Sequence, residues 1–240
     1  MSAAFTGEDW RLWRAPASEP APDPGPLWKE GRPTRIMPLG DSITRGQGNE
    51  ATGGWRKTLL DALAADGRSV RQVGWMTDVA PAGFQAVGGW RIKDHLGWGT
   101  RGVVHGVNAI DAVRIFNPDT ILVHLGTNDV GSGVTANQLA DYLMAYRMLL
   151  DQAHAFVPAA HVFIARIVLL ENRWAGTRTY NGMVETMVTE YVAQGRPYHL
   201  VRGMEDMPDG SWADGIHPNA QGYNYMATVW KTALDAAAQT

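Results

Sequence analysis

Three short polar segments of this 240-residue chain, GDSIT, GTND and DGIHP, contain side chains that could do chemistry together. They supply Ser42, Asn128, and Asp214 followed three residues later by His217. A serine hydroxyl is a weak nucleophile that needs a base to take its proton, and histidine can act as that base near neutral pH. A carboxylate on the other ring nitrogen holds the imidazole in the required tautomer. The segments therefore predict acyl transfer, with Ser42 as nucleophile, His217 as base and Asp214 as the partner of His217.

The oxyanion of the tetrahedral intermediate needs hydrogen-bond donors aimed at it. The backbone N–H of Ser42, the side-chain amide of Asn128 and the backbone N–H of a glycine within residues 83–90 are the candidates. Each segment also has a structural interpretation when taken alone. Asp and Ser favour helix N-caps, Asn-Asp favours a turn, and Pro218 favours the start of a helix. Their combination favours a catalytic site.

These segments must be positioned by the elements that precede them. Apolar runs predict strands over 35–39, 70–75, 120–125, 161–170 and 198–201. Helical spacing of apolar residues predicts helices between and after them, over 53–66, 103–116, 135–156, 179–194 and 219–238. Continuous apolar strands that alternate with helices are typical of a parallel α/β sheet covered on both faces. Because chemistry in such sheets lies at the carboxyl ends of the strands, the three segments are expected to converge there. Residues 77–100 are expected to be an irregular, glycine-rich loop.

The first 33 residues differ from the rest of the chain, which predicts a proline-rich arm or tail over 1–33 and one domain over 34–240. Five prolines fall within eleven residues between positions 16 and 26, and proline at this density favours extended chain. One interpretation is a disordered tail. The other, which we favour slightly, is an arm that packs back through Trp10, Trp13 and Trp28, because tryptophan buries a large area.

Composition excludes several classes of function. The formal net charge of -3 gives no basic excess that would favour nucleic acid or an anionic membrane. The absence of cysteine excludes disulfides and thiolate chemistry, and the other histidines show no ligand spacing, so no metal is predicted. No apolar run approaches the roughly 20 residues that span a membrane. The N-terminal segment lacks the pattern of a signal peptide, so the cytoplasm is the default expectation, with secretion and the oligomeric state left open.

The order GDSIT, Gly88-Gly89-Trp90, GTND and DGIHP resembles the SGNH (GDSL-type) hydrolases, which are named after their Ser, Gly, Asn and His. The resemblance runs from about residue 35 to residue 238. It implies a flavodoxin-like three-layer α/β/α sandwich and a serine esterase without metal or organic cofactor. It also implies an oxyanion hole made by Ser42, Asn128 and a glycine. We choose Gly89 as that glycine because it directly precedes Trp90, with Gly88 as the alternative.

Within that family, the segment FQAVGGWRI is similar to the Gly-Trp block of carbohydrate esterase family three, the acetylxylan esterase group. IMPLGDSIT and GGWRKTLLDAL resemble the same group, although Val87 and Gly88 stand where it usually has a histidine. The resemblance implies a small-molecule or polysaccharide ester as substrate, with acetyl on a carbohydrate as the best interpretation. Trp90 is the first candidate for a platform under a sugar ring. Trp98, Trp174 and Trp212 are further candidates, and loop packing is the alternative for all of them.

Other functions fit the same residues and are kept as alternatives. One is another SGNH activity, such as a lipid esterase or thioesterase. The other is a non-catalytic carbohydrate-binding or structural module that retains the fold. Within the site, Asp214 either orients His217 or only stabilises its loop, in which case a backbone carbonyl stands behind the histidine of a Ser–His dyad.

Overall fold

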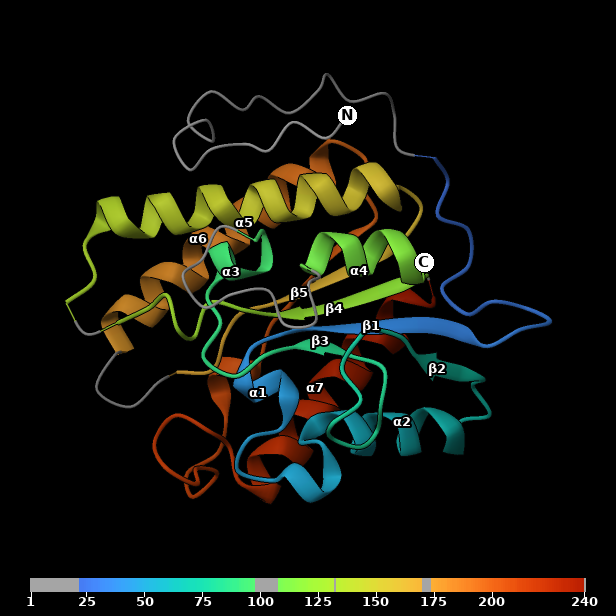
Figure 1. Ribbon diagram of the computed structural model, residues 1–240, viewed down its shortest axis with the longest axis horizontal. Helices are drawn as coiled ribbons and strands as arrows, with labels where there is room; N and C mark the ends of the chain where they lie inside the picture. The colour runs from blue at the N-terminus through green and yellow to red at the C-terminus, as the bar shows by residue number, and fades with distance from the viewer. Residues whose placement is uncertain (1–21, 98–107, 132, 170–173, 240) are drawn as a thin grey trace.

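The computed structural model describes residues 22–97, 108–131, 133–169 and 174–239. A parallel sheet forms its middle layer (Figure 1), in the spatial order β2-β1-β4-β5-β6. The strands are β1 (Thr34–Gly40), β2 (Val70–Gln72), β4 (Thr120–His124), β5 (His161–Ala165) and β6 (Tyr198–Val201). A two-residue strand, β3 (Gln85–Ala86), runs parallel beside the end of β1. The predicted α/β fold with a central parallel sheet is confirmed.

Helices cover both faces of the sheet, as Figure 1 shows. One face carries α3 (Ile92–His95), α4 (Ala109–Phe116), α5 (Ala136–Phe156) and α6 (Trp174–Ala193). The other carries α1 (Ser42–Arg45), α2 (Trp55–Ala65) and α7 (Ala220–Ala237). Successive residues of β4 alternate between the two cores: Ile121 and Val123 face the first and Leu122 faces the second. Burial on both faces explains why the strands are continuous apolar runs.

Some predicted boundaries differ from the structure for local reasons. The strand predicted over 161–170 ends at Ala165, because the side chain of Asn181 then satisfies both the N–H and the carbonyl of Ile167. The helix predicted from residue 103 is described from Ala109, with Asn108 as its N-cap, and residues 103–107 lie outside the described residues. The loop predicted over 77–100 contains β3 and α3.

The described part of the N-terminal arm packs on the domain. Leu27 is 3% exposed and lies in the core beneath α2 and α7. The guanidinium of Arg32 binds both carboxylate oxygens of Asp119, at 2.6 and 2.7 Å. Trp28 is partly buried against the same core, whereas Trp10 and Trp13 lie outside the described residues. The division of the chain at residue 33 stays a prediction.

Candidate active site

Ser42 is held at the carboxyl end of β1 by a tight turn. The strand ends at Gly40, where a Cβ atom would overlap the carbonyl of His124 and the side chain of Thr44, so only glycine fits. Asp41 is the N-cap of α1 and accepts the backbone N–H of Ile43 at 3.0 Å. This cap makes Ser42 the first residue of the short helix, and its side chain is directed to the site while the residue is only 3% exposed.

The structure brings Ser42, His217 and Asp214 together across 175 residues of sequence. Nε2 of His217 lies 2.9 Å from Oγ of Ser42, and Nδ1 lies 2.8 Å from Oδ2 of Asp214. The loop that carries the last two runs between β6 and α7. Oδ1 of Asp214 accepts the backbone N–H groups of Ile216 and His217, at 3.0 and 2.8 Å, and these bonds close the loop on itself.

Electrostatics favours one proton arrangement in this chain of hydrogen bonds. Burial would raise the pKa of Asp214, but hydrogen bonds from the backbone and ring of His217 and from Ile216 outweigh it, so the pKa lies below its ordinary value. Asp214 is therefore a carboxylate at neutral pH and accepts the Nδ1–H of His217. The lone pair of Nε2 then faces the hydroxyl of Ser42. This arrangement can remove the serine proton as a carbonyl carbon is attacked.

The turn over residues 87–90 connects the candidate oxyanion donors. One N–H of the Asn128 amide donates to the carbonyl of Trp90 at 2.8 Å, and its second N–H has no partner among the described residues. Residues 87–90 form a turn, closed by the bond from Trp90 N to Val87 O at 3.2 Å, in which Gly89 has a φ of 76°. Within the described part of the chain, no hydrogen bond uses the N–H of Ser42, Gly88 or Gly89.

The choice between the two glycines stays open. A Cβ atom built on Gly88 would lie 3.8 Å from Cβ of Ser42, which places Gly88 next to the nucleophile. Position 89 favours glycine, because its positive φ lies in the region that other residues rarely adopt. Both glycines therefore belong to the turn beside Ser42.

The prediction that Trp90 serves as a platform for a sugar ring is wrong. Its side chain is buried, at 2% exposure, and packs edge-on against the ring of His95 with a centroid distance of 5.0 Å. Trp90 acts instead through its backbone, because its carbonyl holds the Asn128 amide. Trp212, in the histidine loop, is partly buried. Trp98 and the side chain of Trp174 lie outside the described residues.

Two buried carboxyl groups lie behind these loops. Oδ2 of Asp129 accepts the N–H of Ile92 at 3.2 Å, so the GTND loop is tied to the Gly-Trp loop a second time. Burial raises the pKa of Asp129 to about 7 and the pKa of Asp41 to about 6, because water is excluded from both side chains. Their environments stabilise the neutral acids, unlike that of Asp214. These two residues hold loops in place and do not contact Ser42 Oγ through any hydrogen bond of the described residues.

Gln47 lies beside the predicted residues, and the motif analysis missed it. Its Oε1 would lie 3.7 Å from a Cβ atom on Gly88, next to Ser42. It follows GDSIT by three residues, but glutamine at that position belongs to none of the recognised segments. Only the folded turn shows that its side chain reaches the site.

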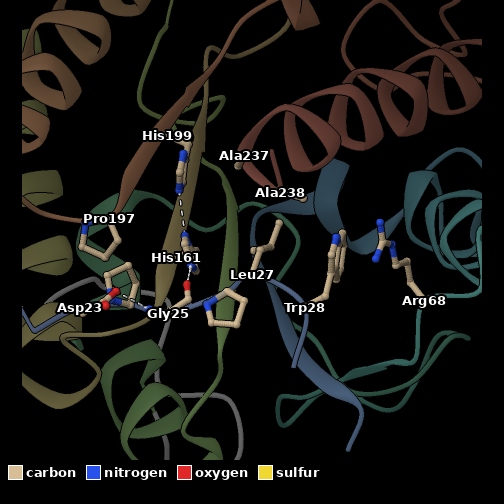
Figure 2. A pocket seen from close by; sticks show the side chains of 12 residues that line it. Asp23, Gly25, Leu27, Trp28, Arg68, His161, Pro197, His199, Ala237 and Ala238 are labelled. Atoms are coloured by element: carbon tan, nitrogen blue, oxygen red, sulfur yellow. Dashed lines mark hydrogen bonds between the residues drawn. The ribbon is translucent and has the colours of Figure 1, made fainter. Parts of the chain in front are cut away.

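A hollow of about 760 Å³ lies at the opposite, amino-terminal edge of the sheet, where β5 and β6 begin (Figure 2). Nε2 of His161 lies 3.1 Å from the carbonyl of Gly25, and its Nδ1 lies 3.0 Å from Nε2 of His199. A carbonyl only accepts, so His161 carries its proton on Nε2, and Nδ1 accepts from His199. Among the residues that the structure describes, no carboxylate or hydroxyl forms a hydrogen bond with these rings. Nowhere in the described ranges do three His, Cys, Asp or Glu side chains gather as a metal site would require.

Comparisons with known proteins show which family the chain resembles in sequence. A model of the GDSL-like lipase/acylhydrolase family matches residues 39–225. A multidomain esterase of Ruminococcus flavefaciens is 29% identical over an alignment of length 225, and the match covers 82% of this chain. The chain spans only 28% of the length of that relative.

Two solved structures share the fold at identities too low to show more than the fold. A family 3 carbohydrate esterase of Clostridium thermocellum has a TM-score of 0.70 at 22% identity, covering 87% of this chain and 98% of that one. A family 3 carbohydrate esterase of Talaromyces cellulolyticus has a TM-score of 0.68 at 24% identity, covering 86% and 98%. No helix in the described part of the chain is long and apolar enough to cross a membrane.

Proposed function

Because the chain belongs to the GDSL-like lipase/acylhydrolase family and is thus a carboxylic ester hydrolase, we propose that it removes short acyl groups, acetyl above all, from carbohydrate hydroxyls. The observation that carries the proposal is the hydrogen-bonded chain from Ser42 through His217 to Asp214. The substrate is a small-molecule or polysaccharide ester, and the residues require no metal or organic cofactor for this reaction.

The proposed reaction proceeds in two halves. Oγ of Ser42 attacks the ester carbonyl carbon while Nε2 of His217 takes its proton. The oxyanion is bound by the N–H of Ser42, the free N–H of Asn128 and the N–H of Gly88 or Gly89. His217 then gives its proton to the departing alcohol oxygen, which leaves an acyl-serine. Water attacks this ester with His217 again as the base, and acetate leaves as the serine regains its proton.

The choice of a short acyl group rests on sequence and on the relatives. The loops over 74–100 and 202–217 are rich in glycine, tryptophan and charge and lack a continuous apolar run for a long acyl chain. Both solved structures named above are called carbohydrate esterases of family 3. Burying each CH₂ of an acyl chain contributes about 0.8 kcal/mol, so an enzyme with an apolar acyl site improves with chain length. An enzyme shaped for acetyl loses rate as the chain grows, because the carbonyl is misplaced.

A series of nitrophenyl esters tests this proposal beside acetate release from acetylated xylan. We expect kcat/KM to fall from acetate to butyrate and to be very low at octanoate, with acetate released from the polysaccharide. A maximum at hexanoate or longer without acetate release contradicts the carbohydrate assignment and favours a lipid esterase or thioesterase. A fluorophosphonate probe should label Ser42, and the absence of labelling would indicate a non-catalytic module, because only an activated serine reacts.

A further inference from the structure

The backbone of Gln47 is anchored to two parts of the site. Its N–H donates to the carbonyl of Ser42 at 2.9 Å, and its own carbonyl accepts the hydroxyl of Tyr223, from α7, at 2.6 Å. Gly46 just before it ends α1 in a left-handed conformation, with a φ of 99°. The position of Gln47 is therefore set by the nucleophile turn and by the last helix together.

The side chain of Gln47 reaches from this anchor toward the reacting groups. Its Oε1 would be 3.7 Å from a Cβ atom on Gly88, and that atom would be 3.8 Å from Cβ of Ser42. The next residue, Gly48, lies beside the histidine loop, because a Cβ atom built on it would be 3.5 Å from Cβ of His217. The side chain of Gln47 thus lies against the glycine turn beside Ser42, and its backbone continues to the histidine loop. It is partly exposed, and within the described part of the chain its amide has no hydrogen-bond partner.

We propose that Gln47 is a specificity-determining residue that binds a hydroxyl group adjacent to the ester on the alcohol portion of the substrate. This inference rests on the proposed function. An acetyl group has one polar atom, its carbonyl oxygen, and the donors of Ser42 and Asn128 already serve it. The polar groups that remain on a sugar ester are the hydroxyls of the alcohol portion. A carboxamide supplies both a donor and an acceptor, as a hydroxyl requires.

Loss of such a contact is measurable as a change in preference. A site that hydrogen-bonds a substrate hydroxyl discriminates strongly against the analogue that lacks it, and less strongly where water reaches the contact. Because Gln47 is partly exposed, we expect roughly a tenfold effect rather than the larger values of buried sites.

The test compares two acetates that differ only in the neighbouring hydroxyl: trans-2-hydroxycyclohexyl acetate and cyclohexyl acetate. For the wild type, kcat/KM should be higher on the hydroxylated ester. In Gln47→Ala the ratio of the two kcat/KM values should fall about tenfold. Gln47→Glu, which keeps an acceptor, should lose less of the ratio than Gln47→Ala. The matched control is Gln194→Ala, an exposed glutamine after α6, which should keep the wild-type ratio.

Two results would overturn the inference. One is a wild type that shows no preference for the hydroxylated ester. The other is a ratio of the two kcat/KM values that Gln47→Ala leaves unchanged. If that unchanged ratio comes with an equal loss on both esters in a variant with wild-type thermal unfolding, Gln47 is an oxyanion donor instead. Failure of the proposed function has a different signature: no acetate is released from acetylated xylan by the wild type, whatever the ratio on the cyclohexyl esters.

Discussion

Histidines lie at both edges of the parallel sheet, and their partners differ. At the carboxyl edge, His217 lies between the carboxylate of Asp214 and the hydroxyl of Ser42. At the amino edge, His161 lies between the carbonyl of Gly25 and the ring of His199 (Figure 2). Both arrangements have hydrogen bonds near 3 Å, but only the first joins a base to a nucleophile and a carboxylate. Residue type therefore does not decide chemistry here, because the partners on the two ring nitrogens do.

The topology of the sheet explains this difference between the edges. In parallel strands every carboxyl end meets the same edge, and there the chain turns into a helix or loop with free N–H groups. The segments after β1, β4 and β6 all emerge at this edge and carry the candidate catalytic groups. At the amino edge the chain enters the strands. Residues 23–28 of the N-terminal arm line the hollow at this edge, in place of loops that follow strands.

The largest expected effect is the loss of activity caused by substitutions at the carboxyl edge of the sheet, with no such loss from substitutions at the amino edge. Ser42→Ala and His217→Ala should each lower kcat on a small acetate ester by several orders of magnitude, because each removes part of one nucleophilic unit. For the same reason, the double variant should be little worse than either single variant. The matched control is His161→Gln, which should keep kcat within about twofold provided it folds. Either single variant that keeps more than about a tenth of the activity refutes the assignment.

Asn128→Ala should give the next largest effect, because Asn128 is the proposed side-chain oxyanion donor. We expect kcat to fall roughly 10²–10³-fold, about 3–4 kcal/mol, with little change in KM. Steady-state kinetics on the same acetate ester measures both constants. The control is Asn224→Ala, whose surface bond to Thr58 lies away from the site. A large rise in KM with unchanged kcat would instead make Asn128 a substrate-binding residue.

Asp214→Asn should cost less than His217→Ala. The carboxylate is 53% exposed, so water screens its interaction with the imidazolium and replaces part of it. We expect a loss of about 10- to 100-fold in kcat, below the value known for a buried triad aspartate. A loss equal to that of His217→Ala would make Asp214 indispensable. Full activity would indicate a Ser–His dyad, with Asp214 serving only to close its loop.

The smallest expected effect concerns stability at the amino edge. Burial, with a contribution from His161, lowers the pKa of His199 to about 4 from its ordinary 6.5. Between these values the unfolded chain binds more protons than the folded one, so the free energy of unfolding falls as the pH drops from 6.5 toward 4. His199→Gln removes this contribution. Urea unfolding measures the free energy of unfolding at pH 7.5 and at pH 5. Between these two pH values it should fall by about 1–2 kcal/mol less in the variant than in the wild type.

This experiment separates the two edges by kind of effect as well as by size. Activity of His199→Gln, measured at pH 7.5 where the variant is folded, should stay close to that of the wild type. Equal acid sensitivity in the two proteins would show that His199 does not carry the linkage. A large loss of activity at pH 7.5 would show that the edges are coupled.

Sequence alone determined the parts of the site whose geometry is local. Asp214 and His217 are three residues apart, so short-range spacing was enough to pair them. The apolar strand runs predicted the sheet, and a parallel sheet brings carboxyl ends to one edge whatever the loops do. The same alternation of strands and helices predicted a layer of helices on each face of the sheet.

Only the tertiary structure decided which side chains between the motifs reach the site. Trp90 reads as a loop residue in sequence, yet it is buried, because it packs edge-on against His95. Gln47 carries no motif, yet Tyr223, 176 residues away, fixes its backbone beside Ser42. The end of β5 depended likewise on Asn181. Local spacing carries no information on such contacts, because they form only when distant segments meet in the folded chain.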